Sequence, residues 1–194
     1  MLNIPNIQQA MSVFVAEELS EVLNTKVVIG RINMGLLNRI IIDDVLLDDQ
    51  SGQEMLKVTR LSAKFDIMPF FKGKISISSV QLFGFNINLR KETPDSPPNF
   101  KFVLDAFASK DTVKKENSLD LRINSILIRR GRMSYHVLSE EETPGKFNAK
   151  HIQLQNIIAN ISLKALSKDS LNLGIKRLSL DEKASGFSLK KMSL

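Results

Sequence analysis

The sequence predicts a mainly β protein with an N-terminal helix, in which a curved, repetitive and bulged antiparallel sheet forms an apolar-lined, taco-like groove. Three observations predict this class. Apolar and polar residues alternate with period two after Lys26, the alternation slips by one residue at a recurring point, and only about two segments show helical spacing. Hydrophobic residues make up 43% of the 194, which is enough to bury a sizeable core.

The first expected element is a helix from Pro5 to Leu23, within an N-terminal unit of residues 1–24. Its apolar stripe recurs at spacings of three and four and consists of Ile7, Met11, Val15, Leu19 and Val22. Two interpretations fit this helix. Either it packs on the sheet through that stripe and covers the first strand edge, or it is the tail of a membrane anchor that has been removed.

Residues 25–194 form the predicted groove body, a series of strands separated by short polar segments. The strongest break is the loop at 93–99, which holds three of the six prolines and is either a hinge between two halves or a long loop. A short second helix follows it, from Phe100 to Phe107. The segment from Asp48 to Gly52 is typical of a hairpin turn.

The slip in the alternation follows a template with apolar residues at positions 1, 3, 6 and 8. Four copies also have polar residues at every intervening position, beginning at Leu56, Ile75, Leu173 and Phe187. At this composition about 0.7 such copies are expected by chance. One extra residue in a strand, a β-bulge, returns the apolar side chains to the face they had left and bends the strand. Repeated bulges therefore predict a strongly curved sheet with one apolar face.

The sequence allows two arrangements of that apolar face. The sheet either closes into a barrel or sandwich, or remains an open groove for an apolar ligand. The last copy of the template, at residues 187–194, predicts an edge strand, and its position indicates the N-terminal part of a longer repetitive protein. The residues expected to line the groove are Leu61, Ala63, Phe65, Ile75, Ile77, Val80, Leu82, Ile87, Leu89, Leu121, Ile123, Ile126 and Ile128.

Composition and motifs exclude most kinds of chemistry. The absence of Cys removes thiol catalysis, disulfides and nearly all structural zinc sites, and no nucleophile elbow, Walker loop or dinucleotide fingerprint occurs. His136 and His151 are expected to be isolated, and the acidic residues between Asp43 and Asp49 lack the alternating ligands of a calcium loop. The sequence therefore predicts no enzyme, catalytic residue, metal site or cofactor. No run of about 18 apolar residues is present to span a bilayer.

The chain carries a formal net charge of +6, and its densest basic cluster consists of Arg129, Arg130 and Arg132. We interpret this cluster as a solvated hairpin turn, with contact to anionic lipid head groups as the second interpretation. Nucleic acid is not an expected partner, because no aromatic side chain interleaves with the cluster and the chain has a single Tyr for base stacking.

Part of the chain resembles a known family. From Met68 to Leu89, a Pro and two bulky apolar residues precede a Gly, an Ile-x-Ile-x-x-Val-x-Leu strand, a turn and a second strand, as in AsmA-like proteins. The Ile4-Pro5 start, followed by a helix and then by Lys26 to Gly30, is similar to the N-terminal end of the TamB family of translocation and assembly module subunits. The segments from Asp43 to Asp49 and from Asn99 to Phe107 resemble the Bacteroidetes type.

This resemblance implies a non-enzymatic cell-envelope module on the periplasmic side of the inner membrane of a Gram-negative bacterium. The family implies phospholipid transport between inner and outer membranes, or outer-membrane protein assembly. The implied partners are lipid acyl chains, the membrane itself through an N-terminal anchor missing here, and an outer-membrane barrel assembly protein. Two other classes stay open: a scaffold that binds client strands by β-augmentation, and a structural domain whose apolar face is filled by its own side chains.

Overall fold

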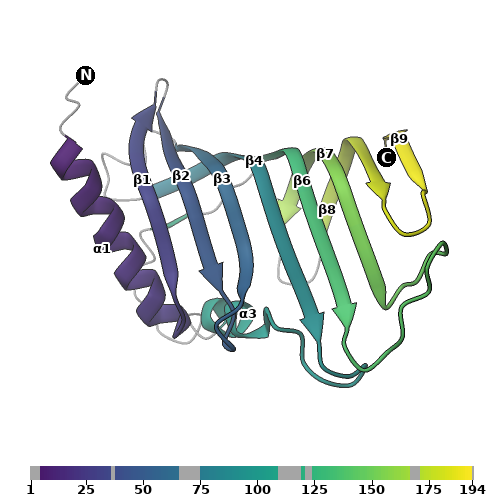
Figure 1. The fold of residues 1–194 in the computed structure, drawn as a ribbon. Coiled ribbons are helices and arrows are strands. Elements are labelled where there is room, and N and C mark those ends of the chain that lie inside the picture. The colour runs from purple at the N-terminus through teal and green to yellow at the C-terminus, as the bar shows by residue number, and fades with distance from the viewer. Residues whose placement is uncertain are drawn as a thin grey trace.

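The computed structural model describes residues 5–35, 38–65, 75–108, 119–120, 124–166 and 171–193, which form one open sheet with two helices (Figure 1). The mainly β class with an N-terminal helix is thus confirmed. In chain order the elements are α1 (Pro5–Leu23), β1 (Val27–Gly35), β2 (Arg39–Asp48), β3 (Glu54–Phe65), β4 (Ile75–Lys91), α3 (Lys101–Ala108), β5 (Leu119–Asp120), β6 (Ser125–Val137), β7 (His151–Leu166), β8 (Leu171–Glu182) and β9 (Ser188–Met192).

The strands lie in the order β1-β2-β3-β4-β6-β7-β8-β9, with β5 beside β4. Neighbouring strands are antiparallel except at β4, which pairs in parallel with both β5 and β6. The described sheet is thus mostly antiparallel, as expected, and the parallel pairing at β4 is the exception. The chain leaves β4 through the loop at 93–99 and α3 before it returns in β6, and a parallel pair requires a crossover of this kind. The loop connects strands of one continuous sheet.

Helix α1 runs beside β1, the first strand of the sheet, as the sequence predicts (Figure 1). The turn that follows α1 is held by side-chain hydrogen bonds: the Val27 N–H donates to Ser20 Oγ at 2.9 Å, and the Gln50 amide donates to the Leu23 carbonyl at 2.9 Å. Asn24 takes a left-handed conformation, with φ of 48°, and ends the helix. The helix thereby shields one edge of the sheet from other strands.

The buried face of α1 differs from the predicted stripe. Ser12, Ala16 and Leu23 are buried, whereas Val22 is 38% exposed. Val15 and Leu19 pack half-buried against the cluster that contains Ala16, and the side chains of Ile7 and Met11 lie outside the described residues. The predicted stripe is thus confirmed at Val15 and Leu19 and wrong at Val22, and the small side chains of Ser12 and Ala16 complete the buried face.

A row of left-handed residues crosses the sheet, and we call it the slip row. It consists of Asp44 on β2 (φ 57°), Gly84 on β4 (φ 65°), Arg130 on β6 (φ 56°) and Asn156 on β7 (φ 55°). Register places these residues at one level. Asp43 pairs with Arg60 of β3, Arg60 with Phe83, and Phe83 with Arg129, while Gly131 pairs with Ile157 of β7. Figure 1 shows the long strands bending part-way along their length, as bulged strands do.

Apolar side chains from both sides of the slip row share one face. Val58 and Leu61 of β3 lie on opposite sides of the row, yet they belong to one apolar cluster, as do Leu82 and Phe85 of β4. In a regular strand, side chains three residues apart point to opposite faces. Register shifts place an extra residue inside the copies of the template that begin at Ile75, Leu173 and Phe187, so the interpretation as a strand with a bulge is confirmed for these three. No register shift falls between Val58 and Leu61 of the fourth copy.

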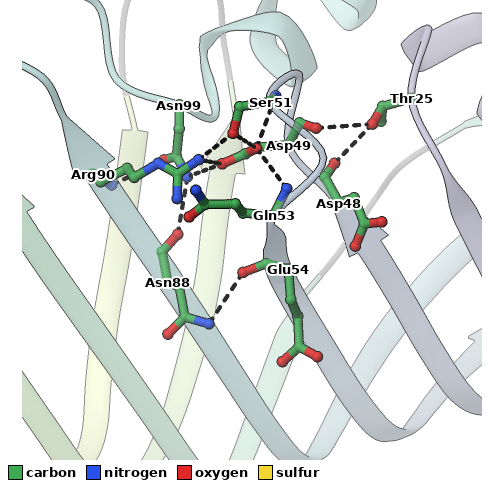
Figure 2. A network of polar contacts seen from close by, with 9 residues as sticks. All are labelled: Thr25, Asp48, Asp49, Ser51, Gln53, Glu54, Asn88, Arg90 and Asn99. Atoms are coloured by element: carbon green, nitrogen blue, oxygen red, sulfur yellow. Dashed lines mark hydrogen bonds and ion pairs between the residues drawn. The ribbon is translucent and has the colours of Figure 1, made fainter.

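A buried carboxylate joins the hairpin between β2 and β3 to the end of β4 (Figure 2). Asp49 is 2% exposed and forms a 2.6 Å ion pair with Arg90. Its carboxylate also accepts hydrogen bonds from the main-chain N–H of Ser51 and Gln53 and from the Asn99 amide. Burial alone would raise the pKa of Asp49, but these hydrogen bonds, with that of the Ser51 hydroxyl, together hold its pKa below the ordinary value. The predicted turn from Asp48 to Gly52 is present, with Gly52 at φ 79°.

Replacing Asp49 by Ala should lower the free energy of unfolding by about 3–5 kcal/mol, because Arg90 would lose its buried partner. Since the folded pKa of Asp49 is depressed, its contribution is fully present above the ordinary Asp pKa and is lost as pH falls through the folded pKa. Denaturant melts at several pH values should therefore show a smaller loss of stability on acidification in Asp49→Ala. The control is Asp48→Ala, because Thr25 donates to the main-chain carbonyl of Asp48, which this variant keeps. Equal costs for the two variants would contradict the role of Asp49.

Gly131 makes room for the ring of Phe85, since a Cβ at Gly131 would lie 2.4 Å from two ring atoms. We expect Gly131→Ala to cost about 1–3 kcal/mol of stability through overpacking. Phe85→Leu should relieve most of this cost, which a double-mutant cycle would measure as a coupling of at least about 1 kcal/mol. Gly145→Ala tests backbone strain without overpacking, because Gly145 has φ of 73° and no neighbour within 4 Å, and its cost should not change with Phe85→Leu. Additive costs for Gly131→Ala and Phe85→Leu would rule out the contact.

Candidate functional site

A continuous apolar cluster spans β2, β3, β4, β6, β7 and β8, and we call it the apolar face. Its centre is formed by Val58, Phe85 and Ile157, which are 2%, 6% and 8% exposed. Half-buried residues surround this centre, and they are Val45, Leu56, Leu61, Leu82, Ile87, Ile128, Met133, Leu154 and Leu180.

The two helices cover a different part of the sheet. Residues of α1 and α3 pack on a cluster centred on Val27, Ile29 and Leu47, towards the β1 end. Among the described residues, every member of the apolar face belongs to a strand, and only Leu56 is shared with the cluster that the helices cover. The half-buried side chains are shielded by one another and by the bends of the strands, and they keep part of their surface open.

Most of the predicted groove residues lie on neighbouring strands in matching register. Leu61 pairs with Leu82 and Ala63 with Val80, while Ile126 and Ile128 lie beside Val80 and Leu82 on β6. Further along β4, Ile87 pairs with Met133 and Leu89 with Tyr135. The main chain of Phe65 pairs with that of Ile77, and Ile75 with Leu119. The side chains of Phe65, Ile75 and Ile77, and all of Leu121 and Ile123, lie outside the described residues.

The three central residues of the apolar face were not among the predicted groove residues, although Val58 belongs to the template copy that begins at Leu56. Val80, Leu82, Phe85 and Ile87 fit the 1-3-6-8 template, but Phe83 occupies an intervening position and breaks the strict form. In the structure Phe83 is 39% exposed and lines cavities with arginines of the opposite face. A looser search, which tolerates one apolar residue next to a glycine in the slip, would have found these positions.

The basic cluster lies in the middle of β6, so the interpretation of residues 129–132 as a hairpin turn is wrong. The left-handed Arg130 forms a bulge and the strand continues in the same direction. Arg129 and Arg130 follow Ile128 and precede Gly131, so both point away from the apolar face. They line a cavity of about 430 Å³ together with Arg177 of β8.

The face opposite the apolar face is therefore basic around β6. The guanidinium of Arg130 lies 5.1 Å from the centre of the Phe83 ring, a cation–π arrangement. Arg60 forms a 2.6 Å ion pair with Asp43, whereas no ion pair joins Arg129, Arg130 or Arg132 to a carboxylate among the described residues. Because these arginines point away from Ile128, they are not placed to hold the head group of a lipid on the apolar face.

His136 and His151 are not isolated, in contrast to the prediction. They are directly opposite each other where β6 ends and β7 begins, and their Nδ1 atoms are 3.1 Å apart. The carboxylate of Glu142, from the connection between the two strands, lies 3.7 Å from His136 Nδ1. Sequence spacing hides this arrangement, because the long connection brings positions 136 and 151 together only once the strands pair.

Comparisons with protein-family models, with curated proteins and with solved structures find no match. In the part of the chain that the structure describes, neither helix has the length and apolar character needed to cross a membrane.

The openness of the apolar face can be measured through stability. Leu82→Asp should cost about 1–2 kcal/mol, because a charge at this half-buried position can still reach water. Val58→Asp, at a position 2% exposed, should cost about 4 kcal/mol or more, or prevent soluble expression. Thermal and denaturant melts of both variants provide the comparison. A cost for Leu82→Asp as large as that for Val58→Asp would identify the face as a closed core.

Proposed function

We propose that this chain is a non-enzymatic module whose apolar face shields lipid acyl chains from water. The observation that carries the proposal is the continuous apolar cluster over six strands, which among the described residues shares only Leu56 with the cluster that the helices cover. A contiguous, partly open apolar surface of this kind is typical of a binding surface rather than of an ordinary solvated face.

The dimensions and energetics of the face suit an extended hydrocarbon chain. Six neighbouring strands at about 4.8 Å spacing give an apolar path of about 24 Å across the sheet. Each methylene group removed from water on this path contributes about 0.8 kcal/mol. A bound chain of several methylenes would therefore gain enough free energy to offset its own ordering, without any catalytic or charged group on the same face.

The resemblance to AsmA-like proteins and the TamB family supports a role for this module in the cell envelope. On that basis we place it on the periplasmic side of the inner membrane, held by an anchor outside this chain. Its role would be phospholipid transport between the inner and outer membranes, or outer-membrane protein assembly with a barrel assembly protein. The bulged strands with one apolar face suit the curved groove that the family implies.

A second candidate function rests on the edge strand β9. This strand pairs with β8 through Leu178–Met192 and Leu180–Leu189, and it is the last strand in the sheet order. The segment was predicted to be an edge strand, and this prediction is confirmed. An edge strand presents unpaired N–H and C=O groups that a client strand can pair with by β-augmentation. The exposed Lys190 and Lys191 give this edge partial protection.

A fluorescent long-chain fatty acid should bind the purified protein, and lipids extracted from that protein should be detectable by mass spectrometry. Ile128→Asp should weaken binding of the probe about tenfold, since about 1.4 kcal/mol corresponds to one decade in Kd. Leu127→Asp is the matched control, because Leu127 is also half-buried but points to the opposite face. Its affinity should stay within about twofold of the wild-type value.

Equal effects of the two substitutions would place the binding elsewhere and refute the proposal. If neither the probe nor an extracted lipid is found, and crosslinking at β9 captures added outer-membrane barrel strands, the scaffold function is favoured. If none of these ligands binds, the face is the core of a structural domain.

A further inference from the structure

The His136–His151 pair and Glu142 bring three metal-binding side chains together at one end of the sheet. The distances from the Glu142 carboxylate oxygen to the two Nδ1 atoms are 3.7 Å and 3.9 Å, and the two Nδ1 atoms are 3.1 Å apart. All three ligand atoms lie within 4.8 Å of one another. Among the described residues, these three form the one such group of potential metal ligands.

These separations match the edges of a tetrahedral metal site. Bonds of about 2.0–2.1 Å from Zn²⁺ to imidazole nitrogen and carboxylate oxygen place neighbouring ligand atoms about 3.3–3.4 Å apart. The observed triangle departs from this by a few tenths of an ångström. We propose that His136 Nδ1, His151 Nδ1 and a Glu142 carboxylate oxygen bind one Zn²⁺ ion, with water as the fourth ligand.

The surroundings of His151 prepare it for this role. His151 is buried, and its Nε2 lies 2.9 Å from the main-chain carbonyl of Glu140, which can only accept a hydrogen bond. The proton of the neutral ring is therefore on Nε2, and the lone pair of Nδ1 points towards His136. A hydrogen bond from the second ring nitrogen to a carbonyl is the usual support of a metal-binding histidine.

The proton of the neutral His136 ring lies on a different nitrogen with and without the metal. Without metal its Nδ1–H can donate to the lone pair of His151 Nδ1 across the 3.1 Å separation. To bind Zn²⁺, neutral His136 moves this proton from Nδ1 to Nε2, so that both Nδ1 atoms offer lone pairs. The side chain of His136 is 23% exposed and lines a cavity of about 510 Å³, which gives room for this change and for the water ligand.

The connection between the two strands is already held near the required position. Glu140 forms a 2.6 Å ion pair with Lys150, and the Val137 N–H donates to the Lys150 carbonyl at 2.9 Å. Glu142 itself is 64% exposed, so its side chain can move the last few tenths of an ångström at little cost. Two imidazoles and one carboxylate favour Zn²⁺ and its neighbours in the transition series over Ca²⁺ or Mg²⁺.

The test uses the full chain after treatment with a chelator. Calorimetry with Zn²⁺ should give one equivalent bound per chain, and Co²⁺ should give the visible absorption bands of a tetrahedral ion with nitrogen and oxygen ligands. Glu142→Gln and His136→Gln should each weaken Zn²⁺ binding by at least about tenfold and remove the Co²⁺ bands. Glu141→Gln is the matched control and should bind as the wild type does, because the exposed Glu141 is not one of the three ligands.

Metal-free melts separate loss of the site from loss of the fold. Glu142→Gln alters an exposed side chain and should melt as the wild type does without metal, so its loss of binding would report on the site alone. No Zn²⁺ binding by the wild type, or binding that Glu142→Gln leaves unchanged, would overturn the proposal and identify the histidines as a hydrogen-bonded pair only. The lipid proposal does not depend on this result, since the three ligands lie outside the apolar face.

Discussion

A change of backbone handedness at one level of the sheet determines which side chains lie on each of its two faces. At the slip row, left-handed residues occur on β2, β4, β6 and β7, and the alternation of side chains resets there. Without this reset, the apolar residues beyond the row would point to the opposite face, because the side-chain period of a strand is two. The apolar face would then be divided, and arginines such as Arg129 and Arg130 would interrupt it. The same reset places two consecutive residues on the opposite face, which concentrates charge there.

Two turns near opposite ends of the described sheet are each closed by a buried carboxylate. Asp49 closes the β2–β3 hairpin, and Glu182, which is 2% exposed, closes the turn between β8 and β9. The Glu182 carboxylate accepts hydrogen bonds from the main-chain N–H groups of Ala184 and Ser185. Burial would raise the pKa of Glu182, but these bonds and that of the Ser185 hydroxyl lower it, as the corresponding bonds do at Asp49. A sheet that leaves much of one apolar face open thus depends on ionised carboxylates to order its turns.

Sequence reasoning succeeded where the signal is local and periodic. The helix at residues 5–23, the bulged strands, the turn at Gly52 and the edge strand β9 follow from spacing and turn chemistry. It failed where tertiary pairing decides the outcome. The parallel pairing of β4 with β6 depends on a crossover, and the meeting of His136 with His151 depends on strand register. The position of Arg130 was predicted incorrectly because an arginine in a left-handed conformation is uncommon. A basic cluster around a glycine is more typical of a turn than of a bulge within a strand.

The shared level of the slip row also restricts which strands can be added to the sheet with their side chains in phase. The β8–β9 pairing carries a register irregularity between Leu178 and Leu180, at the level where β9 has Lys190 and Lys191. A regularly alternating strand added beside β9 would match the sheet in phase on one side of this level and be out of phase on the other. Only a strand with its own reset at that level would match throughout. The spacing of the apolar residues in an added strand, as well as its hydrophobicity, would therefore decide whether that strand can extend the sheet.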